Sequence, residues 1–360
     1  MERGKGILPG QGLRGRGAAS NVAGRFEGIT REAVDDGWDV PEDRVLRTEV
    51  RQEQARSALS YNTSPDLGFD RSVNPYRGCE HGCVYCYARP SHAYLNLSPG
   101  LDFETKLIAR PGIGAVLARE LSAKGYVPQV VVLGSNTDPY QPLEATARVT
   151  REVIEVLRDF NHPLGITTRG SLVERDIDIL GPMAALGLAR VGISLTTLDA
   201  GLARAMEPRA PSPARRLAMI RRLSDAGIPV RVMVSPVIPG LTDHETEAIL
   251  AAARDAGAVA ASSIVLRLPR EVAGLFREWI EATFPDRAAR VMGRVRDLHG
   301  GKEYNAEFGV RMKGQGVWAD LARQRFDVAV RRLGLLVRMP PLRCDLFAVP
   351  GRAGDQMELF

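Results

Sequence analysis

The stretch Asn74-Pro-Tyr-Arg-Gly-Cys-Glu-His-Gly-Cys-Val-Tyr-Cys86 carries three of the four cysteines of this chain on one short loop. It begins inside a short strand-like run, residues 72–76, so the loop is expected at the end of a β-strand. The cysteines, Cys79, Cys83 and Cys86, have the spacing C-x3-C-x2-C. In a reducing compartment such a group indicates a metal site rather than disulfide bonds.

Three thiolates on one loop can hold three corners of a [4Fe–4S] cubane, a cluster that is usually ligated by four cysteines. Because the fourth cysteine, Cys344, lies far along the chain, one iron would stay open. An open iron is what S-adenosylmethionine (SAM) needs in order to bind through its amino and carboxylate groups. We expect Tyr85 to pack on the adenine. We expect Gly78 and Gly82 to let the loop wrap closely around inorganic sulfur.

Other interpretations of these residues remain open at this point. Zinc could be held by the three cysteines together with His81 or His92. The chain would then be a non-catalytic metal-binding protein or a redox sensor. Cys344 is either an ordinary cysteine or a catalytic donor of a hydrogen atom.

Outward from the loop, strand-like runs alternate with helical stretches. Further strands are expected at 129–134, 164–168, 189–195, 229–235 and 259–266, and helices at 144–161, 174–186, 213–226, 244–256, 272–283 and 316–334. Gly187, Gly227 and Gly257 stand where helices should end. Six strand–helix units predict a parallel sheet, either a partial barrel or an open doubly wound sheet, with ligands at the carboxyl ends of the strands.

The composition is that of an ordinary globular protein, with 44% apolar and 25% charged residues. The Gly- and Arg-rich segment 1–45 predicts a poorly ordered leader. The core is expected at 65–285, a basic extension at 286–349 and a flexible tail at 350–360. There is no apolar run that could span a bilayer and no signal peptide, so a cytoplasmic location without membrane attachment is expected.

The positive charge is concentrated near the C-terminus, where residues 267–352 hold 17 Lys and Arg against 10 Asp and Glu. This excess is typical of a surface that binds phosphates, so nucleic acid is a possible partner. The residues expected to contact it are Arg287, Arg290, Arg294, Arg296, Arg311 and Lys313. The alternative is a solvated surface in a protein that uses arginine in place of lysine.

The cysteine loop and its flanking words resemble the radical SAM superfamily, over roughly residues 71–268. The words Asn74-Pro-Tyr-Arg-Gly-Cys79, Tyr85-Cys-Tyr-Ala-Arg89 and Ser135-Asn-Thr-Asp-Pro-Tyr-Gln-Pro-Leu-Glu144 are similar to the branch related to spore photoproduct lyase, the DNA-repair-photolyase-like proteins. The resemblance implies a partial (β/α)6 barrel of the TIM type. It also implies an enzyme that cleaves SAM reductively to a 5′-deoxyadenosyl radical. The substrate would be nucleic acid or, alternatively, a peptide or protein.

The resemblance further implies roles for residues that follow the expected strands. Ser135, Asn136 and Asp138 fall where the superfamily binds the SAM amino group, although the usual Gly-Gly-Glu word is absent. Arg169 would meet the SAM carboxylate. The ribose hydroxyls would be held by Ser194 and Thr196. The electron would come from a flavodoxin or ferredoxin-like donor.

The last residues form a separate short motif. The ending Gln356-Met-Glu-Leu-Phe360 resembles the peptide by which bacterial replication and repair proteins dock on the DNA sliding clamp. Leu359 and Phe360 would each contribute roughly 1.5–3 kcal/mol if buried in a partner. The alternative is that they fold back onto their own barrel.

Overall fold

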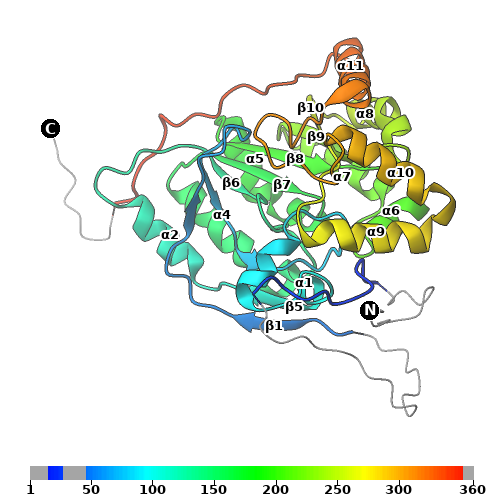
Figure 1. The fold of residues 1–360 in the computed structure, drawn as a ribbon. Helices are drawn as coiled ribbons and strands as arrows, with labels where there is room; N and C mark the ends of the chain where they lie inside the picture. The colour runs from blue at the N-terminus through cyan, green and yellow to red at the C-terminus, as the bar shows by residue number, and fades with distance from the viewer. Residues whose placement is uncertain (1–14, 27–45, 352–360) are drawn as a thin grey trace.

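The computed structural model describes residues 15–26 and 46–351, and a parallel β-sheet lies at its centre (Figure 1). The parallel strands are β3 (Arg71–Val73), β6 (Val131–Leu133), β7 (Leu164–Thr168), β8 (Ala189–Ser194), β9 (Val230–Val237) and β10 (Ala260–Val265). They pair in chain order, and β2 (Leu59–Tyr61) joins the β3 edge in the antiparallel direction. The α/β class and the parallel sheet predicted from the sequence are therefore confirmed.

Helices follow these strands as crossovers. They are α3 (Glu144–Ala147), α4 (Val149–Asp159), η2 (Ser171–Asp176), α5 (Ile177–Ala185), α6 (Ala200–Met206), α7 (Pro213–Asp225), η3 (Asp243–Glu245), α8 (Thr246–Asp255) and α9 (Glu271–Thr283). Gly187, Gly227 and Gly257 end helices with φ of 73°, 75° and 104°, as predicted. The helix expected at 144–161 is interrupted because Arg148 takes a left-handed conformation with φ of 55°.

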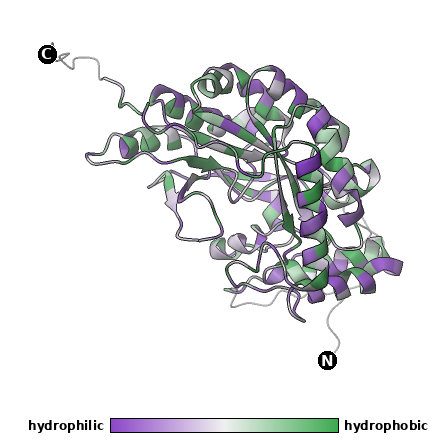
Figure 2. Ribbon diagram, turned by 90° about the horizontal axis from the view of Figure 1, so that it is seen from above, coloured by the Kyte–Doolittle hydropathy of each residue, from purple (hydrophilic) through white to green (hydrophobic). Residues whose placement is uncertain are grey.

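The sheet curves around a cavity. One cavity of about 680 Å³ is lined by side chains from β6, β7, β8, β9 and β10, which a flat sheet would not allow. Apolar residues concentrate on the strands and on the inner faces of the helices, while polar residues cover the outer faces (Figure 2). The curved sheet, whose edges are β2 and β10, fits the partial barrel that the family resemblance implied; the strand pattern alone had left an open doubly wound sheet as the alternative.

A second, smaller sheet lies beside the cysteine loop and was not predicted. It contains β1 (Glu49–Gln52), β5 (Lys106–Ala109) and β4 (Tyr76–Arg77), and the neighbouring helices are η1 (Arg89–Leu95), α1 (Asp102–Thr105) and α2 (Ile113–Leu121). Strand β4 leads into Cys79, whose amide donates to the Phe103 carbonyl at 2.9 Å. This sheet therefore supports the loop from the side away from the barrel.

The extension after α9 is helical. It contains α10 (Pro285–Leu298), which the sequence did not predict and which packs in one apolar cluster with Cys83 and Tyr85, and then α11 (Gly316–Arg332). The chain then forms a segment, residues 335–348, that we call the C-terminal strap. Leu336 bridges β10, the Arg343 amide donates to Gly187 O, and the Ala348 amide donates to Phe160 O. Gly187 and Phe160 precede β8 and β7, so the strap crosses the amino ends of the strands.

Part of the N-terminal leader packs on the molecule. Ala18 is buried, and the Leu101 amide donates to the Ser20 carbonyl. The rest of the leader and the tail Gln356–Phe360 lie outside the described residues. Within the described ranges, no helix is both long and apolar enough to cross a membrane.

Candidate metal and cofactor site

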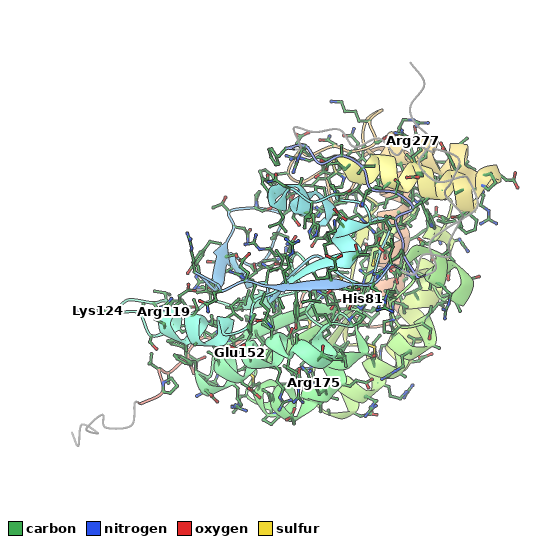
Figure 3. All side chains as sticks on the ribbon, turned by 90° about the horizontal axis from the view of Figure 1, so that it is seen from below. His81, Arg119, Lys124, Glu152, Arg175 and Arg277 are labelled. Atoms are coloured by element: carbon green, nitrogen blue, oxygen red, sulfur yellow. The ribbon has the colours of Figure 1, made fainter. Side chains whose placement is uncertain are left out.

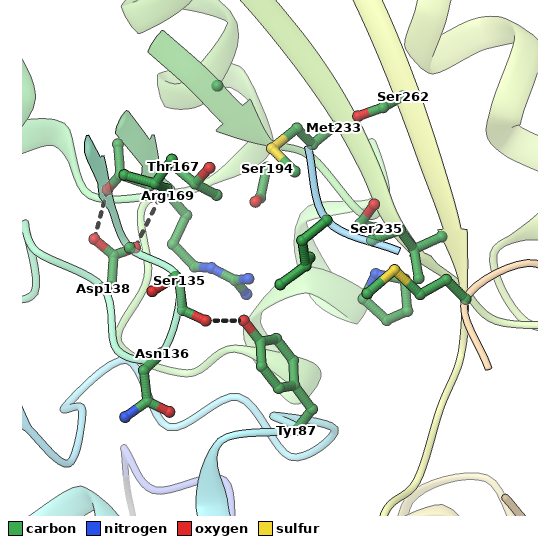
Figure 4. A pocket seen from close by; sticks show the side chains of 18 of the residues that line it. Tyr87, Ser135, Asn136, Asp138, Thr167, Arg169, Ser194, Met233, Ser235 and Ser262 are labelled. Atoms are coloured by element: carbon green, nitrogen blue, oxygen red, sulfur yellow. Dashed lines mark hydrogen bonds between the residues drawn. The ribbon is translucent and has the colours of Figure 1, made fainter. Parts of the chain in front are cut away.

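The three cysteines of the loop border the barrel cavity at the carboxyl ends of the strands. Cys79 and Cys83 are buried and Cys86 is half-buried. The same cavity is lined by most of the other predicted site residues, namely Tyr85, Ser135, Asn136, Asp138, Arg169 and Ser194. Figure 4 shows Arg169 extended into the cavity between Ser135 and Ser194. The structure thus brings together residues that are spread over more than a hundred positions of the chain.

The thiols lie within electrostatic range of one another. Burial raises the pKa of Cys79 well above its usual range, and the charges of Cys83 and Cys86 would raise it further. Burial also raises the pKa of Cys83 to about 12, although the Arg169 guanidinium opposes this. In the described part of the chain, no three Cys, His, Asp or Glu side chains are grouped so as to hold a single metal ion.

A buried amide holds the cysteine loop in place. The Gln141 side chain donates to Gly78 O at 3.1 Å and accepts from the Glu80 amide at 2.9 Å. Thr137, in the same segment, donates to Tyr76 O at 3.0 Å. The segment Ser135–Glu144 therefore has a structural role, because it joins the end of β6 to the cysteine loop. The sequence reading did not assign a role to Gln141.

The glycines of the loop face the protein rather than the cavity. A Cβ on Gly78 would lie 2.6 Å from a Leu107 methyl group, and one on Gly82 would lie 2.7 Å from a Glu104 carboxylate oxygen. Both glycines also have positive φ, 77° and 68°. The two glycines therefore allow the loop to turn and to pack closely on its support, while the expectation that they let it wrap around inorganic sulfur stays a prediction.

A buried ion pair links the loop to the leader. Arg89 donates to Cys83 O at 3.0 Å and to Glu104 at 2.5 Å, and both charged side chains are fully buried. Glu104 also accepts from the amides of Gly17 and Ala18 at 2.9 Å. A Cβ on Gly17 would meet Gly82 O at only 1.7 Å. The leader therefore seals the outer side of the cysteine loop.

Asp138 joins the ends of two strands. Its carboxylate accepts from the Thr168 hydroxyl at 2.5 Å and from the amides of Arg169 and Tyr140 at 2.9 Å. Burial would raise its pKa, but a protonated His81, with Nδ1 at 3.4 Å, and these hydrogen bonds lower it to about 2. Asp138 thus fixes the direction in which Arg169 leaves β7.

The two histidines considered as zinc ligands have different surroundings. His81 lines the cavity next to Asp138 and is 2% exposed; it is labelled in Figure 3. His92 points its Nε2 to the Lys106 carbonyl, 2.9 Å away, on the supporting side of the loop.

A charged cluster that the sequence did not reveal lies behind the cysteines. Glu207, directly after α6, is 1% exposed and accepts from Arg169 at 2.8 Å and from Thr196 at 3.1 Å. It also accepts from Tyr85 and Arg216. Burial opposes its ionisation, but the charges of Arg216 and Arg169 lower its pKa to about 2. Glu207 stands in a polar loop segment with no motif, so only its contacts identify it.

The cluster also defines the positions of three predicted residues. Arg169 lies 2.9 Å from both Cys83 Sγ and the Tyr85 hydroxyl. The Tyr85 ring borders the cavity while its hydroxyl is held by Glu207. Thr196 is buried beside Glu207 and Tyr85.

Tyr87 provides a further polar contact on the cavity wall. Its hydroxyl donates to Ser135 O at 2.5 Å (Figure 4), and the Arg267 guanidinium lies 4.3 Å from its ring centre. Cys344, in contrast, lies in the C-terminal strap beside Arg343, at the amino ends of the strands. The structure does not bring Cys344 to the cysteine loop.

The basic residues expected to bind phosphates are mostly outside the cavity. Arg311 lines it, but its side chain is paired with Asp66 and Ser64 at 2.6 Å. On α10, Arg294 stacks on Trp318 at 4.3 Å and Arg296 lies 3.9 Å from Glu303. Three more of these residues are exposed to solvent: Arg287 and Arg290 on the same helix and Lys313 after it.

Comparison with known proteins identifies relatives over most of the chain. Residues 73–253 match the model of the Radical SAM superfamily. The "Uncharacterized protein Rv2578c" of Mycobacterium tuberculosis (strain ATCC 25618 / H37Rv) is 37% identical over 235 residues, which are 65% of this chain and 68% of that protein. An uncharacterized protein of Methanocaldococcus jannaschii is 26% identical over 173 residues, 48% of this chain and 62% of its own length.

Among solved structures, spore photoproduct lyase in complex with dinucleoside spore photoproduct has a TM-score of 0.58 at 14% identity, covering 80% of this chain and 81% of that one. A mutant of the same enzyme with bound AdoMet and dinucleoside spore photoproduct has a TM-score of 0.56 with the same coverage and identity. At this identity the likeness concerns the fold.

Proposed function

Because the chain belongs to the radical SAM superfamily, we propose that it is an enzyme that cleaves SAM reductively with a [4Fe–4S] cluster ligated by Cys79, Cys83 and Cys86. The observation that carries the proposal is the loop of three cysteines at the mouth of the barrel cavity. When bound, the cluster supplies the electron that breaks SAM into methionine and a 5′-deoxyadenosyl radical, which removes a hydrogen atom from the substrate. We expect a flavodoxin or ferredoxin-like donor for that electron.

The residues fit such a group. Three thiols of one loop share one cavity, and Arg169 places a positive charge 2.9 Å from Cys83 Sγ. Thiolates are the ligand form of cysteine, so binding of the cluster has to release the protons whose loss burial opposes at Cys79 and Cys83. The backbone of the loop is tied by Gln141 and Arg89 before any ligand binds. A loop that is already fixed loses little conformational entropy on binding.

The side chains around the cavity suggest how SAM is oriented. We propose that Arg169 donates to the SAM carboxylate, since its forked guanidinium suits that group. Ser135 and Asn136 would accept from the amino group, and Ser194 would hold the ribose. Thr196 and Asp138 act indirectly in this proposal, because both are engaged by protein partners. Tyr85 would contact the adenine with its ring while Glu207 holds its hydroxyl.

The substrate class that we propose is nucleic acid. Support comes from the shared fold of spore photoproduct lyase, which was solved with a dinucleoside, and from the basic C-terminal third. A peptide or protein is the second candidate. The logarithm of the binding constant for DNA or RNA should fall linearly as the logarithm of the salt concentration rises. The nucleic-acid proposal is wrong if binding is absent at low salt or does not change with salt.

The test of the reaction is anaerobic. The protein is reconstituted with iron and sulfide, reduced with dithionite and given SAM, and 5′-deoxyadenosine is measured. We expect product from the wild type and from Cys344→Ala, and none from Cys79→Ala. No product above the Cys79→Ala background would refute the proposed activity.

A spectroscopic measurement separates the enzyme from a non-catalytic metal protein. We expect the EPR signal of the reduced cluster to change when SAM is added, because SAM binds the open iron. An EPR signal that does not change when SAM is added indicates a non-catalytic iron–sulfur protein. Zinc without iron in elemental analysis indicates a zinc protein.

A further inference from the structure

Two arginines point into the barrel cavity from neighbouring strands, far from the cysteine loop. Arg190 lies on β8 and Arg231 on β9, and both line the cavity. The register pairs Arg231 with Gly192, two residues after Arg190, so the two side chains share the inner face of the sheet. Both are half-buried.

Neither arginine has a carboxylate partner among the described residues. Arg190 donates to Pro340 O at 3.3 Å and Arg231 donates to Val337 O at 3.4 Å, both in the C-terminal strap. These are long contacts to neutral acceptors. The Nε atom of Arg231 is buried without any partner.

The two fully buried arginines of the described chain have carboxylate partners: Arg89 is paired with Glu104, and Arg216 with Glu207. Burial lowers the pKa of Arg190 and Arg231, and the charge of Arg190 lowers that of Arg231 further. Two like charges held side by side with part of their water removed are unfavourable unless an anion offsets them.

The surrounding cavity has space and polar groups for such an anion. Gly165, paired in register with Arg190, leaves room on the inner face, because a Cβ there would lie 3.9 Å from Arg190 Nε; the space over Gly192 is taken by the Met233 side chain. The hydroxyl of Ser262 on β10, paired in register with Met233 two residues after Arg231, is buried without a partner and borders the cavity (Figure 4).

The position of Arg190 along β8 also indicates how long a bound molecule would be. Arg190 precedes Ser194 by four residues on one strand, which corresponds to roughly 13 Å. Ser194 stands at the end of the cavity that holds the cysteines. A molecule that reaches from the level of Ser194 to the arginine pair therefore has about the length of a nucleotide.

We infer that Arg190 and Arg231 form a phosphate site at the floor of the cavity, which holds the phosphate end of a nucleotide-sized substrate while its other end faces the cysteine loop. A phosphate dianion matches two guanidinium groups in charge and in its number of acceptor oxygens, whereas a carboxylate matches only one. This inference rests on the proposed function for what happens at the other end of the substrate. The binding itself requires neither cluster nor SAM.

The experiment is a calorimetric titration of the full chain at low salt with thymidine monophosphate, thymidine and inorganic phosphate. We expect the monophosphate to bind more tightly than either of the others. Arg190→Gln and Arg231→Gln should each weaken its binding by roughly tenfold, as for the loss of one charge-assisted hydrogen bond. The matched control is Arg119→Gln, an exposed arginine on α2 (Figure 3), which should bind like the wild type.

Two further measurements keep the result interpretable. Thermal melting reports whether a variant is folded, and Arg231→Lys, which keeps the charge, should retain part of the affinity. Substrate-independent cleavage of SAM is measured in the wild type and in Arg119→Gln, both of which should show it; its absence would contradict the proposed reaction and not the phosphate site. If thymidine binds as tightly as its monophosphate, or if the folded Gln variants bind like the wild type, the pair only anchors the strap and the inference is wrong.

Discussion

Replacing Glu207 by Gln tests whether the buried charge cluster supports the site. The substitution keeps the size of the side chain and its capacity to accept from Tyr85, but it removes the negative charge. Arg169 and Arg216 then lose the carboxylate with which both form ion pairs, and no negative charge replaces it. Because both lie next to the cysteine loop, the loss should affect stability and cofactor binding together.

Two arguments give the same magnitude for this loss. The pKa of Glu207 falls from 4.5 to about 2 in the folded chain, and a shift of this size corresponds to roughly 3 kcal/mol of stability. Removing one partner of a buried ion pair costs about 3–5 kcal/mol in other proteins. Since the folded pKa is depressed, this contribution is fully present above pH 4.5 and is lost as the pH falls through 2.

Urea denaturation at pH 7 measures the change in the free energy of unfolding. We expect Glu207→Gln to lose about 3 kcal/mol, and the difference from wild type to shrink below pH 4.5. The matched control is Glu247→Gln, whose partner Arg325 is 2.6 Å away but whose side chain is 34% exposed; it should lose less than about 1 kcal/mol. Equal losses in the two variants would refute the reasoning, because burial would then have no effect on the value of the charge.

Three further predictions concern other parts of the chain. Burial lowers the pKa of His162 to about 4, so as the pH falls the unfolded chain binds this proton first, and roughly 3 kcal/mol of stability should be lost between pH 6.5 and 4. In His162→Gln, the free energy of unfolding measured in urea should therefore depend less on pH over this interval. The assignment is contradicted if the variant and the wild type show the same dependence on pH. Glu104→Gln should free the amides of Gly17 and Ala18, so that hydrogen exchange at residues 15–26 accelerates and the reconstituted cluster is lost faster in air; unchanged exchange would mean that Glu104 does not hold the leader. Deletion of Gln356–Phe360 should abolish binding to a bacterial sliding clamp without changing the melting temperature, whereas a lower melting temperature would assign the tail to the fold.

The parts of the fold that were predictable are specified by nearby residues. Strands such as β7 and β8 are short runs rich in Val, Ile and Thr, and the glycines after α5 and α7 mark helix ends because they adopt positive φ. The cysteine loop is likewise readable because its ligands are close in sequence. Six such units in a row leave few possible topologies, so the parallel sheet followed from local signals.

The parts that were not predictable depend on contacts between distant residues. Glu207 is 38 residues from Arg169, with which it forms an ion pair, and nothing in its neighbourhood marks it as buried. The leader was expected to be poorly ordered from its composition, yet residues 15–26 are held by Glu104, 86 and 87 positions away. Composition describes the average tendency of a segment, while a few specific acceptors decide where it packs.

The inward position of Arg190 could also have been predicted from the sequence. Once β8 is known to be a strand of a curved sheet, its period of two places Arg190, Gly192 and Ser194 on one face. Of these, only Ser194 stands at a strand end, where ligands were expected. An arginine beside a glycine on the inner face of a parallel strand is unusual, since such strands are normally apolar on both faces. The alternation alone shows that a positive charge and a glycine share this inner face. The polar residues inside β8 and β9 therefore carry as much information about the substrate as the motifs at their ends.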